Sequence, residues 1–408
     1  MNMLASLIPV FDSNMMVRAY AVETQRENEL RNISLKGTGE LDAASNILGI
    51  ELVNILGSEA FKSSQKVFIK INNVSVFTEI EKICKFPAQK MVLVIDPAIK
   101  PESRYIERIE ELGNLGYRFA ASGFSKHDLD VYVDIISLMD YIIIDSTEKG
   151  TGSFSGVLDK KYPNLRVLVA GIKDRETFDR YSRTEICDFF MGPFFTVPIE
   201  KGKKKIEPVK ITYLELINYV NKSDFDIQGA ADVISHDPAL VISLLKAANV
   251  RARNSQITSV RNAAAMLGQK DLRAWVRTTV TKELCSDRPS ELARISLLRA
   301  KFAENIAPLF ELGALKDELF LMGLFSVMDI ILEIPMKEVF EKLKVSDDIK
   351  DVLLNHSGKL LEIYDFMIAY EKADFPFVDK ELLVRDIEDD TIYEAFLDAL
   401  RWFASVYE

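Results

Sequence analysis

The chain has 408 residues, of which 48% are hydrophobic and 28% charged, a globular balance that excludes bulk disorder. The chain has 51 Lys and Arg against 62 Asp and Glu, a net charge of −11. It therefore lacks the overall positive field on which nonspecific binding to nucleic acids or anionic membranes depends. The length predicts two or three domains. No apolar run reaches the roughly 20 residues that span a bilayer. We therefore expect a cytoplasmic protein with no membrane or nucleic-acid partner.

The first half alternates short apolar runs with helical segments. A hairpin pattern comes first, at 8–21, with Asp12, Ser13 and Asn14 as its turn. Five apolar runs follow, one about every 25 residues, the length of one strand plus one helix; they stand at 67–71, 91–95, 118–121, 141–144 and 166–170. Such runs are typical of parallel strands buried on both faces. The pattern predicts an α/β domain, either a barrel or an open doubly wound sheet.

The second half is helical from residue 211 onward. Asp237 and Pro238 predict a helix start, and Gly268 predicts a helix end. Amphipathic helices are predicted at 292–312, 318–331, 349–354, 360–370 and 391–407. The Lys-rich stretch at 198–208 favours a solvated connection over a basic contact patch. We expect a first domain at 1–200, a linker at 201–210 and an all-α domain at 211–408.

Few residues form a motif that by itself indicates a catalytic, metal-binding or nucleotide-binding site. The chain has three histidines, too few near His236 and Asp237 for an HD-type metal site, so Asp237 is interpreted as a helix cap. The glycine-rich stretch at 150–156 is interpreted as a loop, because its spacing misses the dinucleotide pattern. Asp96 and Asp145 end two predicted strands. There they either hold a divalent ion or cap the following turn, and capping is favoured.

Read together, the two halves resemble bacterial EAL–HDOD signalling proteins. In the first half the resemblance rests on 9–12 (PVFD), 116–124 (GYRFAASGF), 140–145, 167–178 (VLVAGIKDRETF) and 191–198 (MGPFFTVP). In the second half it rests on 234–249, 257–273 and 320–329. The resemblance implies an α/β TIM-barrel-like domain of EAL type, with one antiparallel strand, followed by an all-α HDOD domain. An active EAL domain hydrolyses cyclic di-GMP with two metal ions held largely by carboxylates.

The resemblance also places the family's metal-binding positions. Asp96 and Asp145 keep acidity, and Glu23 stands two residues beyond one such position, on the same strand face and about 7 Å further along. The remaining positions carry residues that are not carboxylates or imidazoles, namely Ala21, Ser122, Gly123, Ile143, Ala170 and Met191 in the barrel, and Ser326 and Val327 at the HD pair. We therefore expect a degenerate EAL domain with no metal, no cofactor and no catalytic residues.

Three cations stand where they would face the phosphates of a bound nucleotide. They are Lys70, Lys173 and Arg175. The alternative, which the composition favours, is that all three are solvated charges, and Arg175 also fits the start of a helix. Binding of cyclic di-GMP is therefore allowed by the sequence but not favoured.

These expectations lead to two hypotheses on function. The preferred one is a non-catalytic scaffold that acts through protein partners of a bacterial regulatory pathway, with a homodimer among the arrangements allowed. The alternative is an effector that binds cyclic di-GMP without hydrolysing it. An active phosphodiesterase is rejected on the count of metal ligands.

Overall fold

The computed structural model describes residues 4–25, 49–50, 52–57, 61, 64–147, 156–158, 160–198, 207–222, 224–251, 256–287, 290–343 and 345–407. Two compact units make up the chain, Met1–Val197 with Ile368–Glu394, and Pro198–Met367 with Ala395–Glu408. The loop predicted at 150–156 lies outside the described residues except for residue 156, and so do residues 201–206 of the expected linker. No helix in the described ranges has the length and apolar character needed to cross a membrane.

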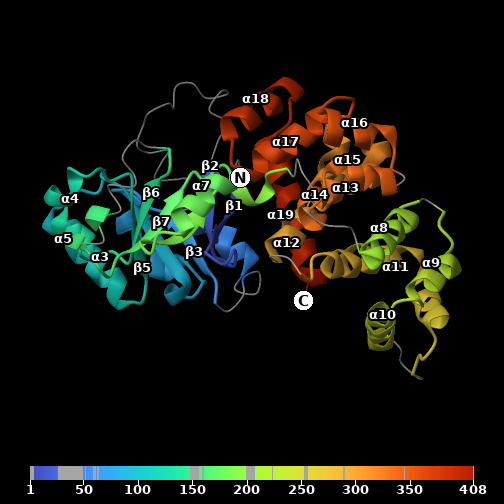
Figure 1. Cartoon of the computed structure of the whole chain (residues 1–408). Coiled ribbons are helices and arrows are strands. Elements are labelled where there is room, and N and C mark those ends of the chain that lie inside the picture. Colours follow the sequence, from blue (N-terminus) through green and yellow to red (C-terminus); the bar gives the residue numbers. More distant parts are fainter. Residues whose placement is uncertain are drawn as a thin grey trace. The chain divides into compact units, whose positions relative to one another are not determined.

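The first unit is built on a closed barrel (Figure 1). Its strands follow one another around the barrel in chain order: β1 Leu4–Phe11, β2 Val17–Gln25, β3 Lys66–Lys70, β4 Met91–Ile95, β5 Arg118–Ser122, β6 Tyr141–Asp145, β7 Arg166–Ala170 and β8 Cys187–Met191. The hairpin and the five apolar runs are confirmed as strands, and of the two α/β architectures left open the barrel is the one formed. Strand β8 was not predicted, because Asp188 interrupts the apolar run in its CDFFM sequence.

Strand β1 runs against its neighbours on both sides. It pairs antiparallel with β2 and with β8, whereas each pair from β2–β3 to β7–β8 is parallel. The C-terminal ends of β2 to β8 therefore lie at one end of the barrel, which we call the mouth, and their N-terminal ends lie at the other, which we call the base. Leu4 is paired with Gln25, so the start of β1 also lies at the mouth.

The barrel interior is filled by alternate residues of the strands, as the two-residue period of a strand requires. On β3, Phe68 belongs to the buried core, and Lys66 and Lys70 flank it at positions of the same parity. The other buried members of this core are Val10, Ala19, Ala21, Val92, Val94, Ala120, Tyr141 and Leu168. An apolar layer therefore separates the mouth from the base.

Gly192, which directly follows β8, allows the backbone to pass close to the backbone of Ile172. Its φ is 150°, and a Cβ placed there would lie 2.1 Å from the carbonyl oxygen of Ile172. The backbone nitrogen of Ile172 donates to the carbonyl of Met191 at 3.2 Å. A side chain at this position would break that approach, because no Cβ tolerates contact at such a distance.

The strands are connected by short helices and turns that surround the barrel. These elements are η3 Ser75–Phe77, α2 Ile80–Ile83, η4 Ala88–Lys90, α3 Ser103–Asn114, α4 Asp128–Val131, α5 Val133–Ile136, α7 Arg175–Ser182 and η5 Pro193–Thr196. In α3, Tyr105, Ile109 and Leu112 are buried at the spacing of one helical face, which is how an amphipathic helix covers a sheet.

A C-terminal segment, Ile368–Glu394, packs with the barrel rather than with the helices around it in sequence. It holds the mouth ends of β1 and β2. The hydroxyl of Tyr370 accepts from the backbone nitrogen of Ala5 at 3.4 Å, and Ser6 Oγ donates to the carbonyl of Glu371 at 2.9 Å. Gln25 Nε2 lies 2.8 Å from each carboxylate oxygen of the buried Asp379. Burial raises the pKa of Tyr370, so its hydroxyl stays neutral at physiological pH.

The second unit is helical; α18 belongs to the first unit, and α17 and α19 each contribute residues to both units. The helices of this part of the chain are α8 Pro208–Val220, α9 Ile227–Ile234, α10 Pro238–Arg251, α11 Val260–Leu284, α12 Ser290–Ile306, η6 Ala307–Phe310, η7 Gly313–Leu315, α13 Lys316–Phe325, α14 Met328–Leu332, α15 Met336–Lys342, α16 Asp347–Asn355, α17 Leu361–Glu371, α18 Phe375–Arg385 and α19 Asp389–Tyr407.

The local helix signals of this region are confirmed in part. Asp237 caps α10, since its Oδ1 accepts from the backbone nitrogens of Ala239 and Leu240 at 2.8 and 3.1 Å. The helix end predicted at Gly268 is confirmed: the residue has a φ of 71°, outside the helical range, and it divides α11 into two helical stretches, the second of which continues to Leu284. The helix predicted at 318–331 is divided at Ser326 and Val327 into α13 and α14.

Candidate functional site

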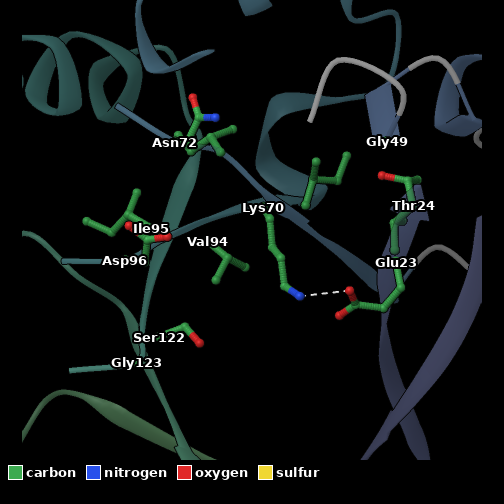
Figure 2. A pocket seen from close by; sticks show the side chains of 13 residues that line it. Glu23, Thr24, Gly49, Lys70, Asn72, Val94, Ile95, Asp96, Ser122 and Gly123 are labelled. Carbon is green, nitrogen blue, oxygen red and sulfur yellow. Dashed lines mark hydrogen bonds and ion pairs between the residues drawn. The ribbon is translucent and has the colours of Figure 1, made fainter. Parts of the chain in front are cut away.

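A pocket of about 390 Å³ lies at the mouth of the barrel, where the C-terminal ends of β2 to β5 meet. We call it the mouth pocket (Figure 2). The described residues that line it are Val22, Glu23, Thr24, Gly49, Ile69, Lys70, Ile71, Asn72, Val94, Ile95, Asp96, Ser122 and Gly123. Ligands of barrel enzymes bind at this end, because the loops that follow the parallel strands converge there.

An ion pair joins two neighbouring strands across the mouth pocket. Lys70 Nζ, at the end of β3, lies 2.7 Å from Glu23 Oε2 on β2, and the dashed line in Figure 2 marks this contact. The pairing of Val22 with Ile69 in the parallel ladder sets the two side chains next to each other. The Lys70 side chain is 59% exposed and that of Glu23 is 27% exposed. An anion that enters the pocket can therefore compete with Glu23 for the ammonium group.

Two polar side chains on the β3 and β4 side are engaged with the backbone. Asp96 follows β4, and its Oδ1 accepts from the backbone nitrogen of Ala98 at 2.8 Å. Asn72 is buried, and its Oδ1 accepts from the nitrogens of Val74 and Ser75 at 2.9 and 2.8 Å. Capping is thus confirmed for Asp96, which nevertheless keeps a second carboxylate oxygen at the pocket.

The resemblance implies a two-metal centre at the mouth, which needs several carboxylate or imidazole ligands close together. In the described part of the chain, no group of three or more His, Cys, Asp and Glu side chains stands close enough to hold a metal ion. The described carboxylates that line the mouth pocket are Glu23, which is paired with Lys70, and Asp96, which is bonded to a turn. These described residues therefore do not fit a two-metal site.

The other predicted candidates lie away from the mouth pocket. Asp145 ends β6, and its Oδ1 accepts from both the nitrogen and the hydroxyl of Thr147 at 2.7 Å. Lys173 is exposed, and Arg175 begins α7, where its guanidinium pairs with Asp179 at 3.1 Å and lies over the Phe178 ring. Of the three predicted phosphate contacts, only Lys70 is among the described residues of the pocket.

Most of the non-acidic positions serve the barrel core or the pocket wall. Ala21 is buried in the core, and Ile143, Ala170 and Met191 pack against it, while Ser122 and Gly123 line the mouth pocket. In the second unit, Ser326 Oγ accepts from Arg299 Nη1 at 3.0 Å and donates to the carbonyl of Gly323 at 2.7 Å. Val327 is fully buried.

Glu23 lines the mouth pocket although it stands at none of the family's metal-binding positions. It lies two residues after Ala21, so the strand period directs it to the same face, one step nearer the mouth. Asn72 was missed, because it lies beyond the apolar run that predicted β3. Alternation along β2 is the signal that finds Glu23; no local pattern marks Asn72.

Comparison with known proteins supports part of the resemblance. The HDOD domain family model matches residues 206–356, within the helical second half. Cyclic di-GMP phosphodiesterase CdgJ of Vibrio cholerae is 26% identical over 369 residues, which cover 89% of this chain and 84% of that protein. The uncharacterized protein YuxH of Bacillus subtilis is 26% identical over 404 residues, which cover 97% of this chain and 96% of that protein.

Among solved structures, the chain matches the Bacillus subtilis YkuI protein, which has an EAL domain and was solved in complex with cyclic di-GMP and calcium. The match has a TM-score of 0.38 and 15% identity, and it covers 65% of this chain and 73% of that one.

The similarity to CdgJ corrects the expected function. The sequence predicted a non-catalytic scaffold, with non-hydrolytic sensing as the alternative, and no enzyme. The relative that matches 89% of this chain is named as a phosphodiesterase, which contradicts these expectations. The expectation rested on the count of metal ligands at the family's positions; the mouth pocket also has the carboxylate of Glu23, which stands two residues from one of them.

Proposed function

We propose that this chain is a cyclic di-GMP phosphodiesterase of the EAL–HDOD kind, which binds the dinucleotide at the mouth pocket. The observation that carries the proposal is the similarity to CdgJ along 89% of the chain, barrel and helical region together. The matching HDOD model at 206–356 supports the same two-part organisation. We propose the division as a barrel domain at 1–200, a linker at 201–210 and a helical domain at 211–408.

The mouth pocket has the charges that such a ligand needs. The phosphodiester oxygens of the dinucleotide contact Lys70, an exposed cation held by a single carboxylate. Carboxylate and phosphate oxygens are both anionic acceptors that form charge-assisted hydrogen bonds with an ammonium group, so a phosphate can replace Glu23 as the partner of Lys70. Binding therefore releases the Glu23 carboxylate into the pocket beside the ligand.

Hydrolysis adds one water across a phosphodiester bond. The water oxygen bonds to phosphorus, the bond from phosphorus to the 3′ oxygen breaks, and a linear dinucleotide with a 5′ phosphate is formed. The released Glu23 accepts the proton of the water and returns it to the leaving 3′ oxygen. Asp96 orients the water from the β4 side. Such proton transfer contributes about a hundredfold to ten-thousandfold in rate.

The test is turnover of cyclic di-GMP by the purified full chain in buffer containing Mg²⁺ or Mn²⁺. Formation of the linear dinucleotide is followed by chromatography, and binding is measured separately by calorimetry. We expect turnover by the wild type and weaker binding by Lys70→Ala, by about tenfold or more, because a charged hydrogen bond is lost. Lys173→Ala removes an exposed cation outside the pocket and is the matched control. A wild-type chain that binds cyclic di-GMP but never converts it contradicts the proposal.

A further inference from the structure

A second pocket, of about 240 Å³, lies at the base of the barrel. We call it the basal pocket. Its lining includes the first residue of three strands, Lys66 of β3, Tyr141 of β6 and Arg166 of β7, together with Arg18 of β2 and Phe189 of β8. Barrels of this class bind their ligands at the mouth, so a pocket at the base that gathers three cations needs its own explanation.

Two of these cations lie against one aromatic ring. Lys66 Nζ donates to the hydroxyl oxygen of Tyr141 at 2.7 Å and lies 5.2 Å from the centre of its ring. The guanidinium carbon of Arg166 lies 5.7 Å from the same centre. The ring is buried, Lys66 is half-buried and Arg166 is exposed. Two like charges are thus held near each other by a tyrosine whose own hydroxyl proton remains available for donation.

The third cation of the basal pocket, Arg18, differs from the other two because it forms an ion pair. Arg18 Nε lies 2.7 Å from Asp12 Oδ2 and is neutralised. In the described part of the chain neither Lys66 nor Arg166 forms an ion pair with an acidic group, although the whole chain has more acidic than basic residues. The basal pocket therefore holds two positive charges without a counter-charge from the described residues.

Another arginine at the base of the barrel, Arg118, does have an acidic partner. Arg118 is the first residue of β5, just as Arg166 is the first residue of β7, and it pairs with Asp140 at 3.2 Å. Arg118 is not among the described residues of the basal pocket. The chain thus supplies an acidic partner to the arginine outside the pocket and none, within the described ranges, to the arginine inside it.

The remaining wall of the basal pocket is apolar. The Phe68 ring lies 5.3 Å from that of Tyr141 in an edge-to-face arrangement, and the Phe189 ring lies 6.0 Å from it. Phe68 and Tyr141 belong to the barrel core, which closes the pocket on the side of the mouth. A ligand here therefore meets both cations and aromatic rings.

We propose that the basal pocket binds the phosphate monoester of a small ring-bearing molecule, of the class of a nucleoside monophosphate. A phosphate monoester carries about −1.5 to −2 charges at neutral pH, which matches the two unbalanced cations. The guanidinium group offers the paired donors that suit phosphate oxygens, and the Tyr141 hydroxyl offers one more. The aromatic wall accommodates the ring of the ligand.

The test is a calorimetric titration of the full chain with AMP, adenosine and inorganic phosphate. We expect saturable binding of AMP, at least tenfold weaker binding of phosphate alone, and no binding of adenosine. Lys66→Met and Arg166→Gln each weaken AMP binding about tenfold or more, since each removes one charged contact. Arg118→Gln, an arginine change at the same end of the barrel, leaves AMP binding within twofold.

The outcomes separate this inference from the function of the mouth. We expect saturating cyclic di-GMP to leave the affinity for AMP unchanged, because the apolar core lies between the two pockets. If the chain binds AMP but does not hydrolyse cyclic di-GMP, the result supports the basal site and contradicts only the proposed activity. Adenosine binding as tight as that of AMP overturns the inference. So does unchanged AMP affinity in a Lys66→Met, Arg166→Gln double variant that melts within a few degrees of the wild type.

Discussion

Strand β3 presents a lysine at both ends of the barrel, and the two lysines have different neighbours. Lys70 at the mouth is paired with Glu23, whereas Lys66 at the base contacts Tyr141 and has no ion pair among the described residues. Phe68 lies between them on the same face of the strand. The comparison teaches that the groups already bound to a lysine determine what ligand binding changes. At Lys70 an anionic ligand replaces the carboxylate of Glu23, whereas at Lys66 it adds an anion where no described residue supplies one.

The apolar layer makes the two ends separable. Changes at sites that share no partner add independently in most proteins. The side chains of the mouth pocket and those of the basal pocket are different residues, divided by the buried core of the barrel. Variants at one end are therefore expected to leave ligand binding at the other end unchanged.

The largest effect is expected on turnover at the mouth. Glu23→Gln removes the proton acceptor that the proposed hydrolysis requires, and the rate of cyclic di-GMP conversion should fall at least about a hundredfold. The rate is measured by chromatography of the linear product. Arg166→Gln, a change at the base, is the control and should keep the rate within twofold. Equal loss in both variants would break the comparison between the ends.

The next effect concerns the fold at the mouth ends of β1 and β2. Gln25→Ala leaves the carboxylate of Asp379, which is 1% exposed, without the amide group that lies 2.8 Å from both of its oxygens. Loss of one hydrogen bond to a buried charged group costs about 1.5–3 kcal/mol, so the free energy of unfolding should decrease by that amount. Chemical denaturation measures it, with the exposed Lys173→Ala as control. A change below about 0.5 kcal/mol would show that the contact is not formed in solution.

The architecture followed from the sequence more fully than the sites did. Apolar runs such as 67–71 and 141–144 predicted strands, because parallel strands buried on both faces leave a continuous signal. The basal pocket left no such signal, since Lys66 and Arg166 each stand just before or at the edge of an apolar run and read as solvated ends. Their proximity arises from the closure of the barrel, which brings together residues 100 positions apart in the chain.

The C-terminal segment illustrates the same limit. The helical pattern at 360–370 was correctly predicted, but nothing in it shows that Tyr370 contacts Ala5 rather than the preceding helices. Likewise Glu23 was visible as an inward neighbour of Ala21, yet only the ladder shows that it meets Lys70. Local pattern predicts faces and ends of elements; pairings between distant residues depend on the tertiary packing.

A moderate effect is expected when the base is made to resemble the mouth. Ser64 lines the basal pocket and is exposed, so Ser64→Glu places a carboxylate near Lys66 and Arg166. The new acid competes with the phosphate, and AMP affinity measured by calorimetry should fall about tenfold, while cyclic di-GMP affinity stays the same. Ser64→Gln is the matched control without charge. If the glutamine variant weakens AMP binding as much as the glutamate variant, then charge is not what the pocket recognises.

The smallest effect is expected for stability at the mouth. Lys70 and Glu23 are 59% and 27% exposed, and ion pairs in such positions contribute about 0–1 kcal/mol, because water already solvates both groups and ordering long side chains costs entropy. A double-mutant cycle with Lys70→Met and Glu23→Gln, followed by urea denaturation, should therefore give a coupling free energy below about 1 kcal/mol. The same Glu23→Gln change should nevertheless tighten cyclic di-GMP binding several-fold, because it removes the competitor for Lys70 while it abolishes turnover. Affinity and rate that move in opposite directions are the result expected if the ligand takes the place of Glu23 at Lys70; a rate and an affinity that fall together would place Glu23 among the groups that hold the ligand.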